Sequence, residues 1–205
     1  MKKIFSIVLV AALVITGIIG ATGMSVSAAD SNKYNEETLQ EVYEEFTASI
    51  NPQKYYDSLS EGVQIALIKT YAPEEWQTLK NMLVETTVVV TDTKGGPQTI
   101  IVTVTGYDGS LVAYYFRHTI TWSWDSGYVT DIDTEIEGEG YTIGGLRWEY
   151  DDAPQYSYYT ETWAPDNIWV DVESHGYFHE YVLGIKWRSF STNLDSRVFG
   201  NGLSE

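Results

Sequence analysis

Five acidic residues occupy alternate positions of one short stretch of the chain. Residues 128–140 read YVTDIDTEIEGEG, and the acids are Asp131, Asp133, Glu135, Glu137 and Glu139. Alternate side chains of a β-strand point to the same side, so these carboxylates share one face, opposite Ile132 and Ile136. Such a row fits acid–base catalysis, cation binding or simple solvation of an exposed strand. We expect the solvated face.

The spacing of the acids does not make a calcium loop. A loop that begins at Asp131 needs glycine at its sixth position and glutamate at its twelfth, where the chain has Ile136 and Thr142. Neighbours on one face of a straight strand are about 6.6 Å apart, so two carboxylates can share an ion but five cannot. We therefore expect no metal site here.

The same strand resembles a catalytic signature. The stretch Asp131–Gly138 is similar to the E-I-D-x-E signature of the sandwich-fold β-glucanases. The resemblance implies a retaining glycoside hydrolase in which Asp131, Asp133 and Glu135 act as nucleophile, helper and acid/base. The chain has Asp131 where the family has glutamate, and 126–128 do not match the tryptophan and glycine that usually precede the motif. A glycoside hydrolase is therefore carried as an alternative function.

The remaining chemistry-bearing residues form no recognised motif. His118 and His179 alternate with apolar residues and are expected at the edge of the core, whereas His175 and His179 are too far apart on one strand to chelate an ion together. No G-x-S-x-G motif and no phosphate-binding glycine loop is present. We expect no catalytic residue, no bound metal and no cofactor.

Aromatic residues are the most unusual feature of the composition. The chain has 16 Tyr and 7 Trp, which is more than we expect a single hydrophobic core to bury. Exposed tyrosine and tryptophan offer rigid, flat contact area with one polar tip. The residues we expect to bind a ligand through an aromatic sheet face are Tyr156, Tyr158, Tyr159, Trp163 and Trp169. The ligand class is left open between carbohydrate and an extracellular protein.

The N-terminus and the charge indicate export. Residues 1–29 combine two lysines, a long apolar run and a small-residue cleavage region, which predicts a signal peptide and a secreted or cell-surface protein with no membrane span after cleavage. The alternative is an uncleaved N-terminal anchor, because the apolar run is close to the length that spans a bilayer. The formal net charge is −17, which disfavours nucleic acid and anionic membranes as partners. The chain has no cysteine, so disulfides and a lipid-modified cysteine are excluded.

The periodicity divides the chain into a helical part and a β part. Residues 30–84 carry apolar stripes at helical spacing, with Asn35 as the expected first N-cap and Pro73 opening the last helix. Residues 85–190 alternate with period two between turn signals, which predicts about eight antiparallel strands. One strand is expected over 177–190, and 191–205 are expected to form an irregular tail.

The sequence thus predicts an α+β, mainly β, fold: a helical segment followed by an antiparallel β-sandwich or barrel. The function we expect is non-catalytic binding by a secreted or cell-surface protein. The alternatives are the glycoside hydrolase and a structural envelope component. The oligomeric state is left open.

Overall fold

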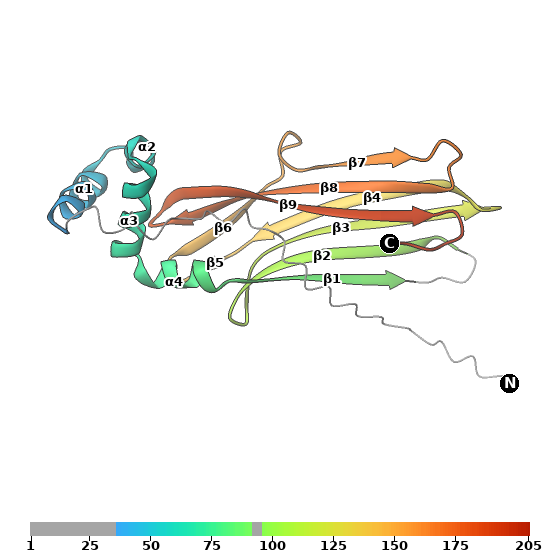
Figure 1. The fold of residues 1–205 in the computed structure, drawn as a ribbon, viewed down its shortest axis with the longest axis horizontal. Coiled ribbons are helices and arrows are strands. Elements are labelled where there is room, and N and C mark those ends of the chain that lie inside the picture. The colour runs from blue at the N-terminus through green and yellow to red at the C-terminus, as the bar shows by residue number, and fades with distance from the viewer. Residues whose placement is uncertain (1–35, 92–95) are drawn as a thin grey trace.

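The computed structural model describes residues 36–91 and 96–205, in which helices come first and strands follow (Figure 1). The helices are α1 (Glu36–Ala48), α2 (Pro52–Ser58), α3 (Glu61–Tyr71) and α4 (Pro73–Asn81). The expected signal peptide and the expected cap Asn35 lie outside the described residues. The described chain is mainly β-structure, as the alternating pattern predicts.

The first four strands form an antiparallel sheet, sheet A, in the order β1-β2-β3-β4. They are β1 (Leu83–Thr91), β2 (Gln98–Asp108), β3 (Leu111–Asp125) and β4 (Tyr128–Gly140). On β3 the even-numbered side chains from Tyr114 to Trp122 are buried and the odd ones between them are half-buried. The even-numbered residues of this stretch are mostly apolar and the odd-numbered ones mostly polar, so the sequence predicts these two faces.

The other five strands form a second antiparallel sheet, sheet B, around the long strand β8. They are β5 (Thr142–Ile143), β6 (Leu146–Asp151), β7 (Tyr158–Trp163), β8 (Trp169–Val182) and β9 (Ile185–Phe199). β9 pairs with one side of β8 along its whole length. On the other side, β7 pairs with the first half of β8 and β6 with the second.

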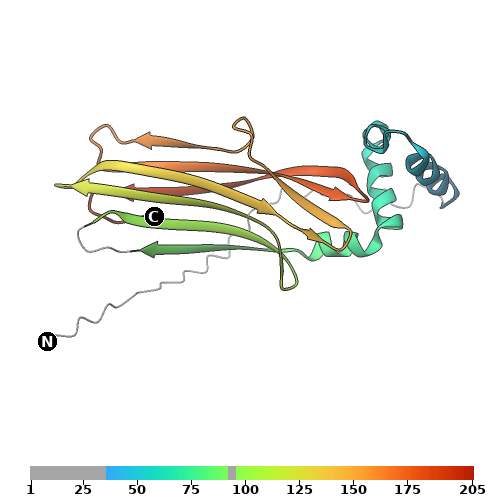
Figure 2. The same cartoon turned by 180° about the vertical axis from the view of Figure 1, so that it is seen from behind.

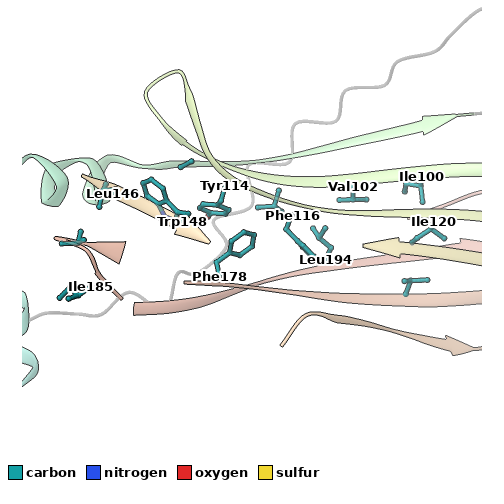
Figure 3. Packing of buried hydrophobic residues seen from close by; sticks show 14 of the residues in the cluster. Ile100, Val102, Tyr114, Phe116, Ile120, Leu146, Trp148, Phe178, Ile185 and Leu194 are labelled. Carbon is teal, nitrogen blue, oxygen red and sulfur yellow. The ribbon is translucent and has the colours of Figure 1, made fainter. Parts of the chain in front are cut away.

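The inner faces of the two sheets share one hydrophobic core (Figure 3). Tyr114 of β3 and Phe178 of β8 meet between the sheets, with ring centroids 5.0 Å apart. Two polar groups are also fully buried: His118 from sheet A, and Glu180 from sheet B, whose Oε2 accepts a 2.5 Å hydrogen bond from Arg188 Nε. Burial raises the pKa of Glu180, and Arg188 opposes this rise.

The helices lie together at one end of the strands (Figures 1 and 2). They hold the β8–β9 hairpin: Trp76 of α4 meets Trp187 edge-on at 5.9 Å between ring centroids. The Gln53 side chain also bonds both backbone groups of Lys186, donating to its oxygen at 3.1 Å and accepting from its nitrogen at 2.7 Å. Phe46, Leu67 and Ile68 extend the core into this end.

The structure corrects the expected elements at three places. Asn51-Pro52 predicts the end of the first helix, but a further short helix, α2, starts there, because Pro52 suits a first helical turn and the Asn51 side chain accepts a hydrogen bond from Lys54 N at 3.0 Å. The expected strand 177–190 is broken by a hairpin turn at Leu183-Gly184. The expected irregular tail instead continues β9 to Phe199, where it pairs with β8.

Candidate binding face

Ring side chains gather on the solvent side of sheet B, along β8. Every even-numbered residue from Val170 to Val182 is buried, so the odd-numbered ones point outward. The second half of this outer row is His175, Tyr177, His179 and Tyr181, each half-buried. We call these four residues and the flanking Tyr156 and Tyr158 the β8 strip.

The flanking tyrosines widen the strip toward β7. The Tyr158 ring stacks on His175 at 5.2 Å between centroids, and the Tyr156 ring stacks on Tyr177 at the same distance. Ser157 between them is buried and fixes the loop, since its hydroxyl donates to the Asp151 backbone oxygen at 2.5 Å and accepts from Tyr177 N at 3.0 Å. The tyrosines are therefore held in place by the sheet, although about two-fifths of each is exposed: 43% of Tyr156 and 45% of Tyr158.

Hydrogen bonds fix both histidines of the strip. His175 Nδ1 donates to Asn193 Oδ1, 2.6 Å away. His179 lies between Asp151, whose Oδ2 is 3.1 Å from Nε2, and Ser189, whose Oγ is 2.7 Å from Nδ1. In the neutral ring, Nε2–H donates to the carboxylate and Nδ1 accepts from the serine hydroxyl. The strip thus presents polar atoms in set directions between its rings.

Each end of the outer face carries an arginine over an aromatic ring. Arg147 lies 4.0 Å from the centroid of Tyr181, at the end of the strip. At the other end of β8, Arg197 lies 4.3 Å from the ring of Trp169 and forms a two-point ion pair with Asp171, at 2.5 and 2.8 Å. These cation–ring contacts hold the side chains flat along the sheet.

Shallow hollows adjoin this face. One, of about 340 Å³, is lined by both sides of the Asp171–Arg197 pair and by Glu173, Asp195 and Glu205. A second, of about 430 Å³, lies where β4 meets β6 and is lined by Glu139, Arg147, Glu149 and Asp152 among others. Both are open and mostly acidic, so they suit uncharged polar or cationic groups better than anions.

The residues predicted to bind divide between two sides of sheet B. Tyr156 and Tyr158 lie on the β8 strip, and Trp169 lies on the same outer face at its far end. Tyr159 and Trp163 point to the other side of β7, because they pair with the inward-facing Ser174 and Val170. They stay exposed, 43% and 38%, at the edge where β7 overhangs the core.

The sequence analysis missed most of the strip. A single strand over 177–190 puts Tyr177, His179 and Tyr181 on one face with the apolar Leu183, Ile185 and Trp187, which is why His179 was expected at the core edge. The turn at Leu183-Gly184 ends that alternation, so the odd residues before it face solvent. A glycine within an alternating run was the available signal for this turn.

The acidic strand forms the solvent face of β4, as predicted. All five carboxylates of 131–139 are exposed, and Thr134 between them is buried. Glu137 pairs with Arg117 at 2.7 Å, and Glu139 accepts a 2.6 Å hydrogen bond from the Tyr141 hydroxyl. Asp131, Asp133 and Glu135, the residues of the β-glucanase resemblance, lie opposite Ser123, Thr121 and Thr119 of β3 and line neither hollow.

Within the described ranges, no group of three or more His, Asp or Glu side chains is arranged to hold a metal ion. Among residues 36–91 and 96–205, no helix is long and apolar enough to cross a membrane. No protein-family model, curated protein or solved structure matches the chain.

Proposed function

We propose that this chain is an exported, non-catalytic binding protein that holds a neutral carbohydrate chain against the β8 strip. The observation that carries the proposal is the row of four half-exposed rings, His175, Tyr177, His179 and Tyr181, on the solvent side of one strand. Sugar rings have apolar C–H faces and hydroxyl edges. A row of aromatic rings with hydrogen-bonding groups between them complements both.

The length of the row favours an oligosaccharide over a single sugar. Residues on one side of a strand repeat about every 6.6 Å, so the four rings extend over about 20 Å. Stacked partners and hydrogen bonds hold the rings before any ligand arrives. Little side-chain entropy then remains to be lost on binding, which supports affinity from modest contacts.

The charge of the surroundings favours an uncharged ligand. Asp151 and Glu149 border the strip on β6, and the whole chain has 29 acidic against 12 basic residues. An anionic polysaccharide would approach a surface of its own sign. The predicted signal peptide at 1–29 and the proposed arrangement of the two sheets as a β-sandwich suit a ligand met outside the cell.

Native affinity electrophoresis through gels cast with neutral polysaccharides tests the proposal. We expect retardation of the protein in at least one gel. We expect Tyr177→Ala and Tyr181→Ala each to weaken binding about tenfold, since each removes about 1–1.5 kcal/mol of ring contact. The matched control is Tyr128→Ala, which removes a tyrosine that is 50% exposed and lies on β4, outside the strip; it should bind as the unmodified protein does.

Other outcomes point elsewhere. Unchanged mobility in every gel would refute carbohydrate binding for that panel and favour a protein ligand or an envelope role. Clearing of the polymer around the band would instead favour the hydrolase alternative. In that case Glu135→Gln should abolish clearing and Tyr177→Ala should not.

A further inference from the structure

The edge of sheet A formed by β1 has no partner among the described residues. β1 pairs with β2 on one side only, and it runs for nine residues without a register shift. A free edge strand presents a row of unpaired backbone N–H and C=O groups, which is a template for another strand. Proteins that stay monomeric usually protect such edges with charges, proline, bulges or short length.

The other long or exposed edges of this protein carry that protection, and β1 does not. β4, at the opposite edge of sheet A, has five acids, and β9 has charged side chains along its length. β7 is only six residues long. β1 reads LVETTVVVT, with Glu85 as its single charge and no lysine or proline. The contrast marks β1 as the edge suited to pairing.

β1 also extends beyond the cover of sheet B. Its even-numbered residues lie on the inner face, because Val90 pairs with the buried Ile100 and Val88 with the buried Val102. Yet Val84 is 46% exposed and Val90 is 47% exposed, whereas Ile100 next to Val90 is 3% exposed. The described residues therefore leave Val84 and Val90 open at the two ends of the inner face of β1, whereas Val88 between them packs against the core.

We propose that β1 pairs with β1 of a second copy of this chain, antiparallel and centred on Thr87, to form a two-fold symmetric dimer. In this register Val84 faces Val90 of the second copy, Thr86 faces Val88 and Glu85 faces Val89. No position brings two charges face to face. The two Glu85 carboxylates are four residues apart along the strands, about 14 Å, beyond the screening length of physiological salt.

The symmetry closes the assembly at two copies. A contact between identical surfaces uses both free edges and leaves none for a third chain. Sheet A becomes one continuous sheet across the dimer, and the open Val84 and Val90 of each copy pack beside Val90 and Val84 of the other. This inference does not depend on the proposed carbohydrate site, because the β8 strip is on the outer face of the other sheet.

Sedimentation velocity of the purified protein at about 150 mM salt, near physiological ionic strength, tests the dimer. We expect a species of twice the chain mass. Val84→Lys with Val90→Lys places two lysine pairs face to face in the proposed register and should weaken dimerisation on the order of 100-fold. Ile168→Lys is the control, since it puts the same charge on a residue that is 42% exposed and remote from β1 in sequence; it should remain a dimer.

A charge exchange tests the register itself. In the variant that combines Val84→Lys with Val90→Glu, the introduced lysine faces the introduced glutamate of the second copy at both symmetric positions, so the dimer should return. Unfolding in urea confirms that each variant is folded. A monomeric unmodified protein, a dimer that survives the double lysine variant, or growth into longer oligomers would each overturn the proposal.

Discussion

His118 is the most deeply placed ionisable residue of sheet A. It has no exposed surface, and its ring nitrogens lie 3.0 Å from Ser174 Oγ and 2.9 Å from Ser196 Oγ, both on sheet B. The neutral ring has one donor and one acceptor, and each serine hydroxyl can serve as either. Every polar atom of the ring is thus satisfied without charge, and the histidine links the two sheets.

Protonation of His118 should destabilise the fold. Burial lowers its pKa from 6.5 to about 4. The unfolded chain therefore binds a proton that the folded chain does not between these pH values, and stability falls as pH decreases through that window. The loss reaches up to about 3 kcal/mol near pH 4, and the contribution is fully present above about pH 6.5. The measurement is the free energy of unfolding in urea at about pH 7.5, above the window, and at about pH 4.5, near its lower end.

The variant His118→Gln isolates this contribution, because glutamine keeps a donor and an acceptor but does not titrate. We expect a smaller difference between the two pH values in the variant than in the unmodified protein. Glu180 acts in the opposite direction, since its raised pKa makes stability fall as pH rises above about 4.5. Glu180 is present in both proteins, so its effect cancels when their pH dependences of stability are compared. Equal pH dependence in the two would refute the role of His118.

Two-residue turns join the strands of the long hairpins and set the pairing next to each turn, up to a register shift at Ser123/Trp124 in one and at Glu180/Tyr181 in the other. β3 and β4 are joined by Ser126-Gly127 and β8 and β9 by Leu183-Gly184, with positive φ at both residues of each turn. Such a turn matches the twist of the paired strands. Glycine adopts this conformation freely, but Ser126 at φ 53° and Leu183 at φ 52° do so at a cost.

Ser126→Asn should stabilise the protein. Asparagine tolerates positive φ better than serine and is favoured at the first position of this turn. Ser126 is exposed, so no packing changes. We expect a gain of about 0.5 kcal/mol in the free energy of unfolding. Ser110→Asn, in the turn between β2 and β3, is the control, because Ser110 does not have positive φ. An equal gain in both variants would contradict the conformational explanation.

The same turns explain how far the sequence predicts the fold. Asp-Gly and Ser-Gly pairs between alternating strands identify the β2–β3 and β3–β4 hairpins and the pairing next to each turn. A register shift at Gly106/Tyr107 and another at Ser123/Trp124 change the pairing farther from the turns, and the turns do not predict these shifts. Leu183-Gly184 lies within a run that alternates on both sides, and Gly184 is the one local signal of a turn there. The pairing of β8 with β9 over their full length is what requires the turn. The same pairing orders 191–199, in which Ser191, Asn193 and Asp195 are exposed and alternate with the buried Thr192, Leu194 and Ser196.

The candidate site was harder to predict than the strands. The abundance of tyrosine and tryptophan indicates a binding surface, but which rings share a face depends on strand parity and pairing. Tyr158 and Tyr159 are neighbours in sequence and lie on opposite sides of β7. Ser189, Asp151 and His179 come from three strands, and no sequence spacing links them.

On the scale of the whole molecule, charge opposes compactness. With 29 acidic and 12 basic residues, at least 17 carboxylates have no cation to pair with. The exposed ion pairs, such as Arg117 with Glu137 and Arg147 with Glu149, each contribute little, and among the described residues the pair of Arg188 with the buried Glu180 is different. Repulsion among the remaining acids acts over the whole surface and is screened by salt. Salt should therefore remove more repulsion than attraction.

We expect the melting temperature at about pH 7.5 to rise by about 5 °C between roughly 20 and 300 mM NaCl, which corresponds to about 2 kcal/mol for a chain of this size. The variant with Val84→Lys and Val90→Lys serves for this measurement, because it separates salt effects on folding from those on dimerisation. Near pH 4.4, where the net charge is about zero, the rise should disappear. A melting temperature that falls with salt at the higher pH would mean that the ion pairs outweigh the repulsion. A rise of equal size at the lower pH would point to exclusion of salt from the protein surface, which does not depend on charge.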